Sequence, residues 1–433
     1  MFQITADFFD NRERSNGRRA AVKGPRIVLA AGGTGGHIMP ALATAEAFRR
    51  MACGVECLFI CGRKEVERAI YREAGHKPIV LPLDRVPGTP AGRLKRYRQM
   101  IESVWKARRA LRRVRPDAVI AFGGYTAAPV IVAAWGMGVP IYLQEQNAVP
   151  GRVNRLFSLF ARRVFIGCPY ARRYFADRKI INTGTPVRQS CLCRTRAAAR
   201  VHFGIAEDEW TLLVIGGSQG AQGVNRLVFE VLERLSASGG AGRPLCVLWS
   251  TGAGEYEDVC GALEKTFTPA GLQDASGRRV LSWNAGAGTM RAVVRPFIGE
   301  MGLAYAAADM AVSRAGAGTV AELLANSVPA VLIPYPHAAD DHQRRNAMLP
   351  HDEGAACIVD ERHPNAAAQI EAVVRELMAD AATAAAMRRA AGRLAQPDAA
   401  DQIARLVLDD LAGRSGAVFS SLNQPQTQGA LKG

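Results

Sequence analysis

Two segments of this chain share an order of strand, glycine-rich loop and helix that few folds accommodate. The first, VLAAGGTGGHIMPALATAEAF, starts at Val28, and the second, VIGGSQGAQGVNRLVFEVL, starts at Val214. Short apolar strands alternate with helix-length segments around both, which is typical of a parallel sheet with helices on its two faces. We therefore predict an α/β fold with two Rossmann-like, doubly wound parallel-sheet domains, which face each other across a cleft at the carboxyl ends of their strands.

Composition shifts divide the 433 residues into two domains and flanking segments, because the chain is too long for one ordinary domain. Residues 1–24 are polar and Arg-rich, and we predict a flexible extension there. We place the N-terminal domain at 25–187, the C-terminal domain at 188–395 and a C-terminal helix at 396–412. The Ser-, Gln- and Gly-rich residues 413–433 are predicted to form a disordered tail.

One segment, residues 118–144, is uncharged and long enough to cross a bilayer. Four glycines and two prolines interrupt it, so we predict a strand, a short helix and a second strand inside a parallel sheet. The start of the chain lacks the apolar core of a signal peptide, and the nine cysteines lack the spacing of a disulfide scaffold. We therefore expect a reducing, cytoplasmic setting.

A formal net charge of +16 implies an anionic partner: nucleic acid, acidic lipid or a phosphorylated substrate. Residues 93–115 concentrate this charge, with ten Lys and Arg against one Glu, and their apolar residues recur at helical spacing. We predict a basic amphipathic helix that lies on an anionic membrane surface. The alternative is a solvated helix whose apolar stripe packs on the sheet. A nucleic-acid-binding protein is disfavoured, because no binding module is recognisable.

The two glycine loops are predicted to bind anions. Glycines let backbone N–H groups approach a ligand closely, and the amino end of the following helix favours negative charge. In the first loop, residues 32–37 (GGTGGH), we expect His37 to be exposed at the helix start and to be the candidate general base. In the second loop, residues 216–220, the hydroxyl of Ser218 suits a phosphate, and Arg188 is a candidate clamp on the same group.

A third glycine loop, residues 316–322 (GAGTVAE), follows a strand and opens a helix. It formally satisfies the dinucleotide fingerprint GxGxxA, with Asp340 roughly twenty residues further on, which leaves a nicotinamide-dependent oxidoreductase as an alternative. The loop falls late in its domain, however, and Glu322 is better placed to bind ribose hydroxyls. No metal is predicted, because the sequence has no Asp-x-Asp pair and the polar residues 341–346 form no Cys/His site.

Seven ordered motifs within about residues 26–411 resemble the MurG family: AGGTGGHIMPALA, FGGYTAAPVIVAA, QEQNAVPGRVNRL, NTGTPVR, VIGGSQGAQGVN, SRAGAGTVAEL and DHQxxNA. The resemblance implies the GT-B fold and inverting transfer of N-acetylglucosamine (GlcNAc) from UDP-GlcNAc to the C4 hydroxyl of undecaprenyl-pyrophosphoryl-MurNAc-pentapeptide (lipid I), which gives lipid II in peptidoglycan synthesis. It implies no cofactor and no nucleic-acid partner. It also implies peripheral attachment to the cytoplasmic side of the inner membrane, and partners among cell-wall synthesis or division proteins.

The resemblance also implies which residues contact UDP-GlcNAc: Thr34, Gly35, Gly36, Asn147, Arg188, Ser218, Ile298, Ala317, Gly318, Thr319, Val320, Ala321, Glu322 and Gln343. In this assignment Arg188 and Ser218 hold phosphates, the backbone of Ile298 pairs with uracil, and Glu322 binds the ribose. The catalytic candidates are His37 and, as a second group, Glu145.

Two departures from the family pattern bear on these expectations. The His that usually precedes the Glu-Gln-Asn motif is Gln144 here, which removes one possible proton-transfer group. Residues 261–295 are longer than usual, which affects the alignment around Ile298. A UDP-GlcNAc 2-epimerase, similar in fold and donor, is a further enzyme alternative. It would need acidic groups around the sugar, and the GGTGGH start argues against it.

Overall fold

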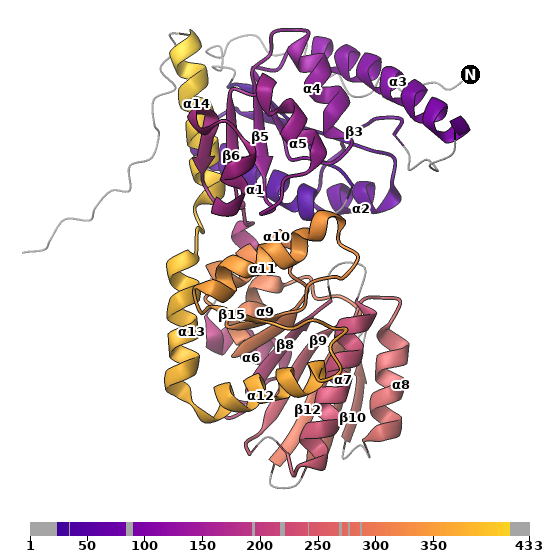
Figure 1. The fold of residues 1–433 in the computed structure, drawn as a ribbon, viewed down its shortest axis with the longest axis vertical. Helices are drawn as coiled ribbons and strands as arrows, with labels where there is room; N and C mark the ends of the chain where they lie inside the picture. The colour runs from indigo at the N-terminus through magenta and orange to yellow at the C-terminus, as the bar shows by residue number, and fades with distance from the viewer. Residues whose placement is uncertain are drawn as a thin grey trace, which may run out of the picture.

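The computed structural model describes residues 24–33, 35–83, 90–192, 195–216, 221–240, 242–267, 271–275, 278–285 and 288–415. The chain forms two α/β lobes, shown one above the other in Figure 1, and each lobe is built around its own sheet. The predicted fold class, two doubly wound domains of largely parallel strands, is confirmed.

In the described chain, the first sheet has seven strands, all parallel, in the order β3-β2-β1-β4-β5-β6-β7. Their bounds are β1 Arg26–Ala30, β2 Glu56–Cys61, β3 Ile79–Val80, β4 Ala118–Ala121, β5 Ile141–Glu145, β6 Arg163–Ile166 and β7 Ile180–Asn182. The helices are α1 Gly35–Met51, α2 Glu65–Glu73, α3 Pro90–Val114, α4 Ala127–Trp135 and α5 Arg152–Phe157. The strand order reverses between β1 and β4, so the loops after these strands meet where doubly wound sheets bind ligands.

The second sheet has eight described strands in the order β10-β11-β12-β9-β8-β13-β14-β15. Their bounds are β8 Trp210–Ile215, β9 Leu245–Ser250, β10 Gly271–Ala275, β11 Arg278–Ala285, β12 Gly288–Arg295, β13 Met310–Ser313, β14 Ala330–Leu332 and β15 Ala356–Ile358. The helices are α6 Arg196–Phe203, α7 Gln222–Ala237, α8 Tyr256–Thr266, α9 Met301–Ala307, α10 Ala317–Ala325, α11 His342–Asp352, α12 Ala366–Ala379 and α13 Ala381–Leu394. Here the order reverses between β8 and β13, and the third glycine loop follows β13 at this point.

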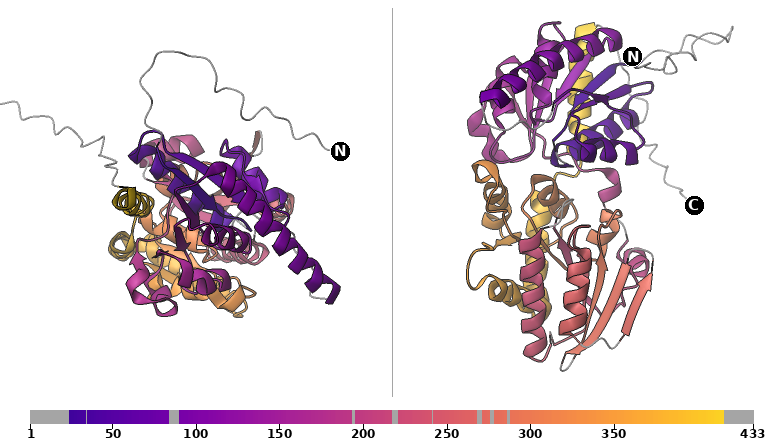
Figure 2. Two further views of the ribbon diagram at one scale, coloured as in Figure 1. Left: turned by 90° about the horizontal axis from the view of Figure 1, so that it is seen from above. Right: turned by 90° about the vertical axis from the view of Figure 1, so that its right-hand side faces the viewer.

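Strands β10, β11 and β12 form an antiparallel ribbon at one edge of the second sheet, visible on the right of Figure 2. Neither this ribbon nor the short strand β7 was predicted from the sequence. The ribbon falls within residues 261–295, the stretch that was expected to be longer than usual. Strand β12 then pairs in parallel with β9 and joins the ribbon to the rest of the sheet.

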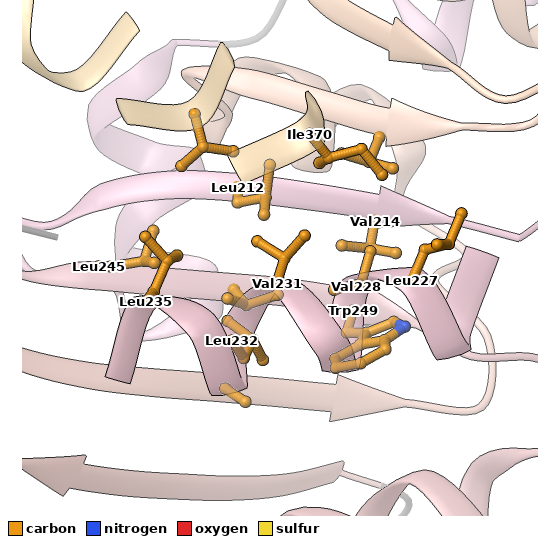
Figure 3. Packing of buried hydrophobic residues seen from close by; sticks show 14 of the residues in the cluster. Leu212, Val214, Leu227, Val228, Val231, Leu232, Leu235, Leu245, Trp249 and Ile370 are labelled. Atoms are coloured by element: carbon orange, nitrogen blue, oxygen red, sulfur yellow. The ribbon is translucent and has the colours of Figure 1, made fainter. Parts of the chain in front are cut away.

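Helix α7 shows how the second domain buries its core. Its apolar residues recur at three- and four-residue spacing from Val224 to Leu235 and pack against β8 and β9 (Figure 3). Trp249 of β9 is fully buried among them, and its indole N–H donates to Oδ1 of Asn225 at 3.0 Å. The one polar atom of this ring therefore enters the core with its partner already in place.

Residues 118–144, the uncharged segment, form β4, α4 and β5 within the first domain, as predicted. Every residue of β4 and β5 is buried, as expected for central strands covered on both faces. Among the helices that the structure describes, none combines the length and the apolar character needed to cross a membrane.

The last helix, α14 (Ala399–Ser415), returns to the first domain. In Figure 1 it stands beside the first lobe, whereas α13 lies along the second. Ile403, Ala404 and Val407 of α14 join the core that β1 and α1 build. The sequence predicted a helix at 396–412 but gave no indication of which domain it covers.

Asp410 fastens α14 to the first sheet. Its side chain is 7% exposed, and its carboxylate accepts hydrogen bonds from Arg163 at 2.6 and 2.7 Å and lies 3.2 Å from Arg162. The hydroxyl of Tyr142 on β5 donates to it at 3.3 Å. The hydrogen bond from Arg163 is the main reason why the pKa of Asp410 falls to about 2. A carboxylate buried here without these partners would strongly destabilise the fold.

We predict that Asp410→Asn lowers the free energy of unfolding by about 1.5–3 kcal/mol at neutral pH, the worth of hydrogen bonds to a charged group. Because the folded pKa lies below the usual value of 3.8, Asp410 contributes its stability above about pH 4 and loses it as the pH falls towards 2. Urea denaturation should therefore show a difference at pH 7 that shrinks near pH 2.5. Asp409→Asn, at an exposed neighbour, is the matched control and should leave stability unchanged.

Candidate active site

The loops after β1 and β4 interlock at the switch point of the first sheet. Gly123 and Gly124 follow β4 with φ of +92° and +75°, a region that favours glycine. A Cβ on Gly124 would lie 2.8 Å from the carbonyl oxygen of Gly32 in the GGTGGH loop. Only a residue without a side chain allows this approach, so the glycines that follow β4 fix the position of Gly32 in the loop after β1.

A buried carboxylate that the sequence analysis missed holds the GGTGGH loop from its other side. Glu67 of α2 is fully buried and accepts hydrogen bonds from the backbone N–H of Gly33 at 2.8 Å and of Gly62 at 2.6 Å. It thereby positions the turn that leads into α1. A single Glu in an amphipathic helix gives no sequence signal for such a role.

His37, in the first turn of α1, lies half-buried against Gly123. The expectation that it is exposed is therefore wrong, because the loop after β4 packs over the imidazole. Its Nδ1 is shielded from solvent and has no hydrogen-bond partner among the described residues. Burial, and then the nearby His342 of α11 in the second domain, lower the pKa of His37 to about 4. The ring is therefore neutral at physiological pH.

Glu145, the second catalytic candidate, organises the loop that follows β5. One carboxylate oxygen accepts hydrogen bonds from the backbone and side chain of Asn147 at 2.9 and 3.2 Å. The other accepts from the N–H of Gly151 at 3.1 Å and from Asn154 at 2.9 Å. Burial raises the pKa of Glu145, although these donors oppose the shift. Because both oxygens are occupied, the geometry gives Glu145 a positioning role and does not support a direct part in proton transfer.

Asn346 of α11 joins the two domains at this loop. It is 5% exposed, and its Oδ1 accepts from the N–H of Ala148 at 2.8 Å. Its Nδ2 donates to Oδ1 of Asn147 and to the carbonyl of Ala315 after β13, both at 3.2 Å. Asn346 belongs to the polar residues 341–346 of the sequence but was not among the predicted site residues. Asn147, a predicted donor contact, is thus held from both domains.

A second cluster surrounds Glu322 on α10. The hydroxyl of Tyr305 from α9 donates to Glu322 at 2.6 Å. The positive charge of Arg188, in the turn between the domains, attracts the Glu322 carboxylate. Burial raises the pKa of Glu322, and these two neighbours oppose the shift. Arg188 also contacts the thiol of Cys191 at 3.6 Å, and its Nε has no described partner. Arg188 and Glu322, predicted from separate motifs, therefore lie in one cluster.

The remaining residues predicted to contact UDP-GlcNAc lie at the starts of two helices and after the end of one strand. Ala317, Gly318 and Thr319 form the first turn of α10, where backbone N–H groups have no partner within the helix. Gln343, in the first turn of α11, accepts a hydrogen bond from the N–H of Tyr335 at 2.9 Å. The side chain of Ile298, after β12, is fully buried, and its backbone makes no hydrogen bond with any described residue.

Three of the residues predicted to contact UDP-GlcNAc line a separate cavity between the domains. A cavity of about 180 Å³ at the seam between the domains is lined by Ala317, Val320 and Ala321 of α10. Its lining is mainly apolar, and Gly184 and Gln396 of the two interdomain connections also reach it. Such a space does not suit a diphosphate, and the N–H of Val320 already donates to the carbonyl of Gly316 at 2.9 Å.

Several predictions have no structural outcome. Thr34 and Ser218 lie outside the described residues. Gly35 and Gly36, at the start of α1, are described and lie next to His37.

Gln144, where the family pattern has His, is fully buried, and its amide atoms have no described partner. Within the described chain, no group of three or more His, Cys, Asp or Glu side chains is arranged to hold a metal ion.

Comparisons with known proteins show the family to which the chain belongs. Residues 27–166 match the glycosyltransferase family 28 N-terminal domain, and residues 211–403 match the C-terminal domain of the same family. The chain is 34% identical over 390 residues, 90% of its length and 97% of the relative's, to the UDP-N-acetylglucosamine--N-acetylmuramyl-(pentapeptide) pyrophosphoryl-undecaprenol N-acetylglucosamine transferase of Salinibacter ruber.

Two solved structures place the fold. MurG of Acinetobacter baumannii superimposes with a TM-score of 0.66 at 26% identity, over 89% of this chain and 100% of that chain. A UDP-GlcNAc 2-epimerase from Neisseria meningitidis bound to UDP-GlcNAc gives a TM-score of 0.59 over 89% and 100% of the two chains. At 10% identity the second match reflects the shared fold alone.

We predict that the imidazole of His37 titrates with a midpoint near pH 4 in histidine-labelled NMR spectra. His342→Ala should raise that midpoint only partly towards 6.5, because burial is the larger cause of the shift. Between pH 6.5 and 4 the unfolded chain binds a proton at His37 that the folded chain does not, so the contribution of His37 to stability falls as the pH falls. A midpoint near 6.5 would mean that the ring is open to water.

Proposed function

Because the chain belongs to glycosyltransferase family 28 as a member of the MurG family, we propose that it transfers GlcNAc from UDP-GlcNAc to the C4 hydroxyl of lipid-linked MurNAc-pentapeptide. The product is the lipid-linked disaccharide, with UDP as the leaving group. The observation that carries the proposal is the approach of a neutral imidazole from one domain to the helix starts of the other. His37 lies near His342, and Asn147 is bonded to Asn346.

His37 is proposed as the base for the attacking hydroxyl. An inverting transfer needs a proton acceptor on the acceptor side of the sugar and a stabilising charge on the leaving side. The low pKa keeps His37 unprotonated and ready to accept, but it also makes the imidazole a weak base. Proton transfer must therefore accompany the attack of the hydroxyl on C1 and cannot precede it.

The second domain is proposed to hold the nucleotide and to stabilise the departing diphosphate. The free N–H groups at the start of α10 and the guanidinium of Arg188 supply positive charge there without a metal ion. Glu322 is proposed to bind ribose hydroxyls, since the hydroxyl of Tyr305 occupies only one of its oxygens. The free backbone of Ile298 is available to pair with uracil.

An epimerase would share the fold, but the acidic residues of this chain suit its reaction less well. Elimination at the sugar needs carboxylates that are free to exchange protons. Glu67 of α2 and Glu145 of β5 are buried and hold loops of the first domain. Each accepts hydrogen bonds at both of its carboxylate oxygens. They are consequently better suited to positioning than to acid–base chemistry, and the transferase is the proposal that we retain.

Because the acceptor carries a polyprenyl chain, the protein has to meet it at a bilayer surface. We propose that helix α3 contacts this surface. Leu94, Tyr97, Ile101 and Trp105 are 62%, 66%, 42% and 68% exposed and share one face of the helix. Leu111 instead packs in the sheet core, so only part of the apolar stripe is covered. Helix α3 runs along the outer side of the first lobe, away from the second (Figures 1 and 2). We propose peripheral attachment to the cytoplasmic face of the inner membrane through this helix.

The function is tested with labelled UDP-GlcNAc and a lipid I analogue. Formation of a labelled disaccharide together with one UDP per transfer would support the proposal. Conversion of UDP-GlcNAc to its C2 epimer without an acceptor would identify an epimerase and contradict it.

In the same assay we predict that His37→Ala lowers kcat by about 10²–10⁴-fold, the range for loss of a general base. Affinity for UDP, measured by calorimetry, should change little, because the proposed nucleotide contacts lie in the other domain. His363→Ala, at an exposed histidine before α12, is the control and should retain full turnover. Near-normal turnover of His37→Ala would remove His37 from the chemistry.

For the donor site, Glu322→Ala should weaken UDP-GlcNAc binding by roughly 1.5–3 kcal/mol, the worth of hydrogen bonds to a charged group. Calorimetry with UDP measures the change, and circular dichroism checks that the variant is folded. An unchanged affinity for UDP would mean that the ribose binds elsewhere.

For the membrane, replacing Arg108, Arg109, Arg112 and Arg113 with Gln should release the protein from anionic vesicles. Binding should also weaken as salt rises, since these charges are screened within ~8–10 Å at physiological ionic strength. Activity on a short-tailed soluble acceptor should survive the change. The same number of Arg→Gln changes at exposed residues of the second domain, Arg226, Arg243, Arg362 and Arg389, is the control. Unchanged sedimentation of the α3 variant with vesicles would place the membrane contact elsewhere.

A further inference from the structure

A basic groove opens at the seam between the domains, beside the contact of Asn147 with Asn346. It encloses about 520 Å³. From the first domain it is lined by Ala148 and by the turn after β6 that holds Arg172 and Arg173. From the second domain it is lined by Arg345 and Met348 of α11. Both domains therefore form its walls. We call this space the basic groove.

The charges of the basic groove are not balanced within it. Arg172 lies 3.2 Å from Asp177, the acidic residue of the lining, so this pair is neutral. Among the described residues, Arg173 contacts only the ring and hydroxyl of Tyr174, and Arg345 makes no ion pair or hydrogen bond with any of them. Both side chains are exposed, so packing of the domain cores does not require them. Two positive charges, one from each domain, thus remain available to an anion.

The basic groove is continuous with the proposed site of transfer. Ala148, in its wall, donates its N–H to Asn346 and directly follows Asn147. Arg345 directly precedes Asn346 on α11. Across the same seam, the hydroxyl of Tyr170 donates to Asp352 at 2.9 Å and holds α11 against the turn after β6. A molecule whose sugar reacts beside Asn147 can therefore extend into the groove without crossing either domain.

We propose that the basic groove binds the free carboxylate at the end of the acceptor's peptide, an assignment that rests on the proposed function. The muramyl group carries a carboxyl function, so a pentapeptide joined to it by an amide bond ends in a free carboxylate. Guanidinium groups bind carboxylates with paired, charge-assisted hydrogen bonds.

A different anion of the acceptor, its pyrophosphate, fits the groove less well. It links the sugar to the lipid and therefore has to stay near the membrane. Helix α3, the proposed membrane contact, lies on the outer side of the first lobe, whereas α11 lies at the junction of the lobes (Figure 1). A groove walled by α11 is on the side to which the peptide, rather than the lipid link, can extend.

The test compares two acceptors that differ in one group: a soluble lipid I analogue with the free carboxylate, and the same analogue with a C-terminal carboxamide. With the wild-type protein, the carboxamide should raise the KM for the acceptor by about 5- to 20-fold, as expected for loss of exposed charge-assisted hydrogen bonds. The double variant Arg173→Gln, Arg345→Gln should raise the KM for the carboxylate acceptor by a similar factor and leave the KM for the carboxamide acceptor and for UDP-GlcNAc unchanged.

The matched control is Arg178→Gln, Arg344→Gln, which removes two exposed charges next to the groove that are not part of its lining. It should behave as wild type with both acceptors. An equal loss on both acceptors in the groove variant, or no loss on either, would overturn the assignment of the groove to the carboxylate. If the wild-type protein transferred GlcNAc to neither acceptor, the proposed function would fail and the groove assignment with it.

Discussion

One buried amide, that of Asn346, connects the two domains where their loops meet, and the geometry of the candidate site depends on it. An amide that is 5% exposed must satisfy its donors and acceptors within the protein, and Asn346 finds them at Ala148, Asn147 and Ala315. The bonds to Ala148 and Asn147 form only when the two domains are in contact, whereas the bond to Ala315 lies within the second domain. The position of Asn147 relative to α10 and α11 is therefore a consequence of domain apposition.

Around that contact, buried carboxylates act as supports and the neutral imidazole is left free. Glu67 and Glu145 bind loop donors with both oxygens, and Asp410 binds arginines to keep α14 on the first sheet. A buried carboxylate without such partners would be costly, so its bonds fix the loops firmly. His37 differs, because its Nδ1 has no described partner and its low pKa keeps it unprotonated. The contrast separates positioning groups from the group proposed to take a proton.

Features that depend on local sequence were predictable, and features that depend on distant contacts were not. The glycine loops and the apolar central strands carry their own patterns, so the two-domain fold followed from the sequence, whereas Arg188 and Glu322 were predicted from separate motifs and the structure brings them together. The roles of Glu67 and Asn346 come from partners in other elements, which no spacing reveals. The half-burial of His37 depends on packing by Gly123, and the return of α14 depends on Asp410 and the core of the first domain.

The central claim, that contact between the domains completes the site, is tested most directly by the kinetics of Asn346→Ala. UDP is proposed to bind groups of the second domain, so its affinity by calorimetry should change less than about threefold. Asn147 would lose one of its supports, and kcat for transfer should fall by about 10- to 100-fold, the usual cost of misplacing a reacting group. A kcat near that of wild type, or a loss that appears entirely in UDP affinity, would contradict the account.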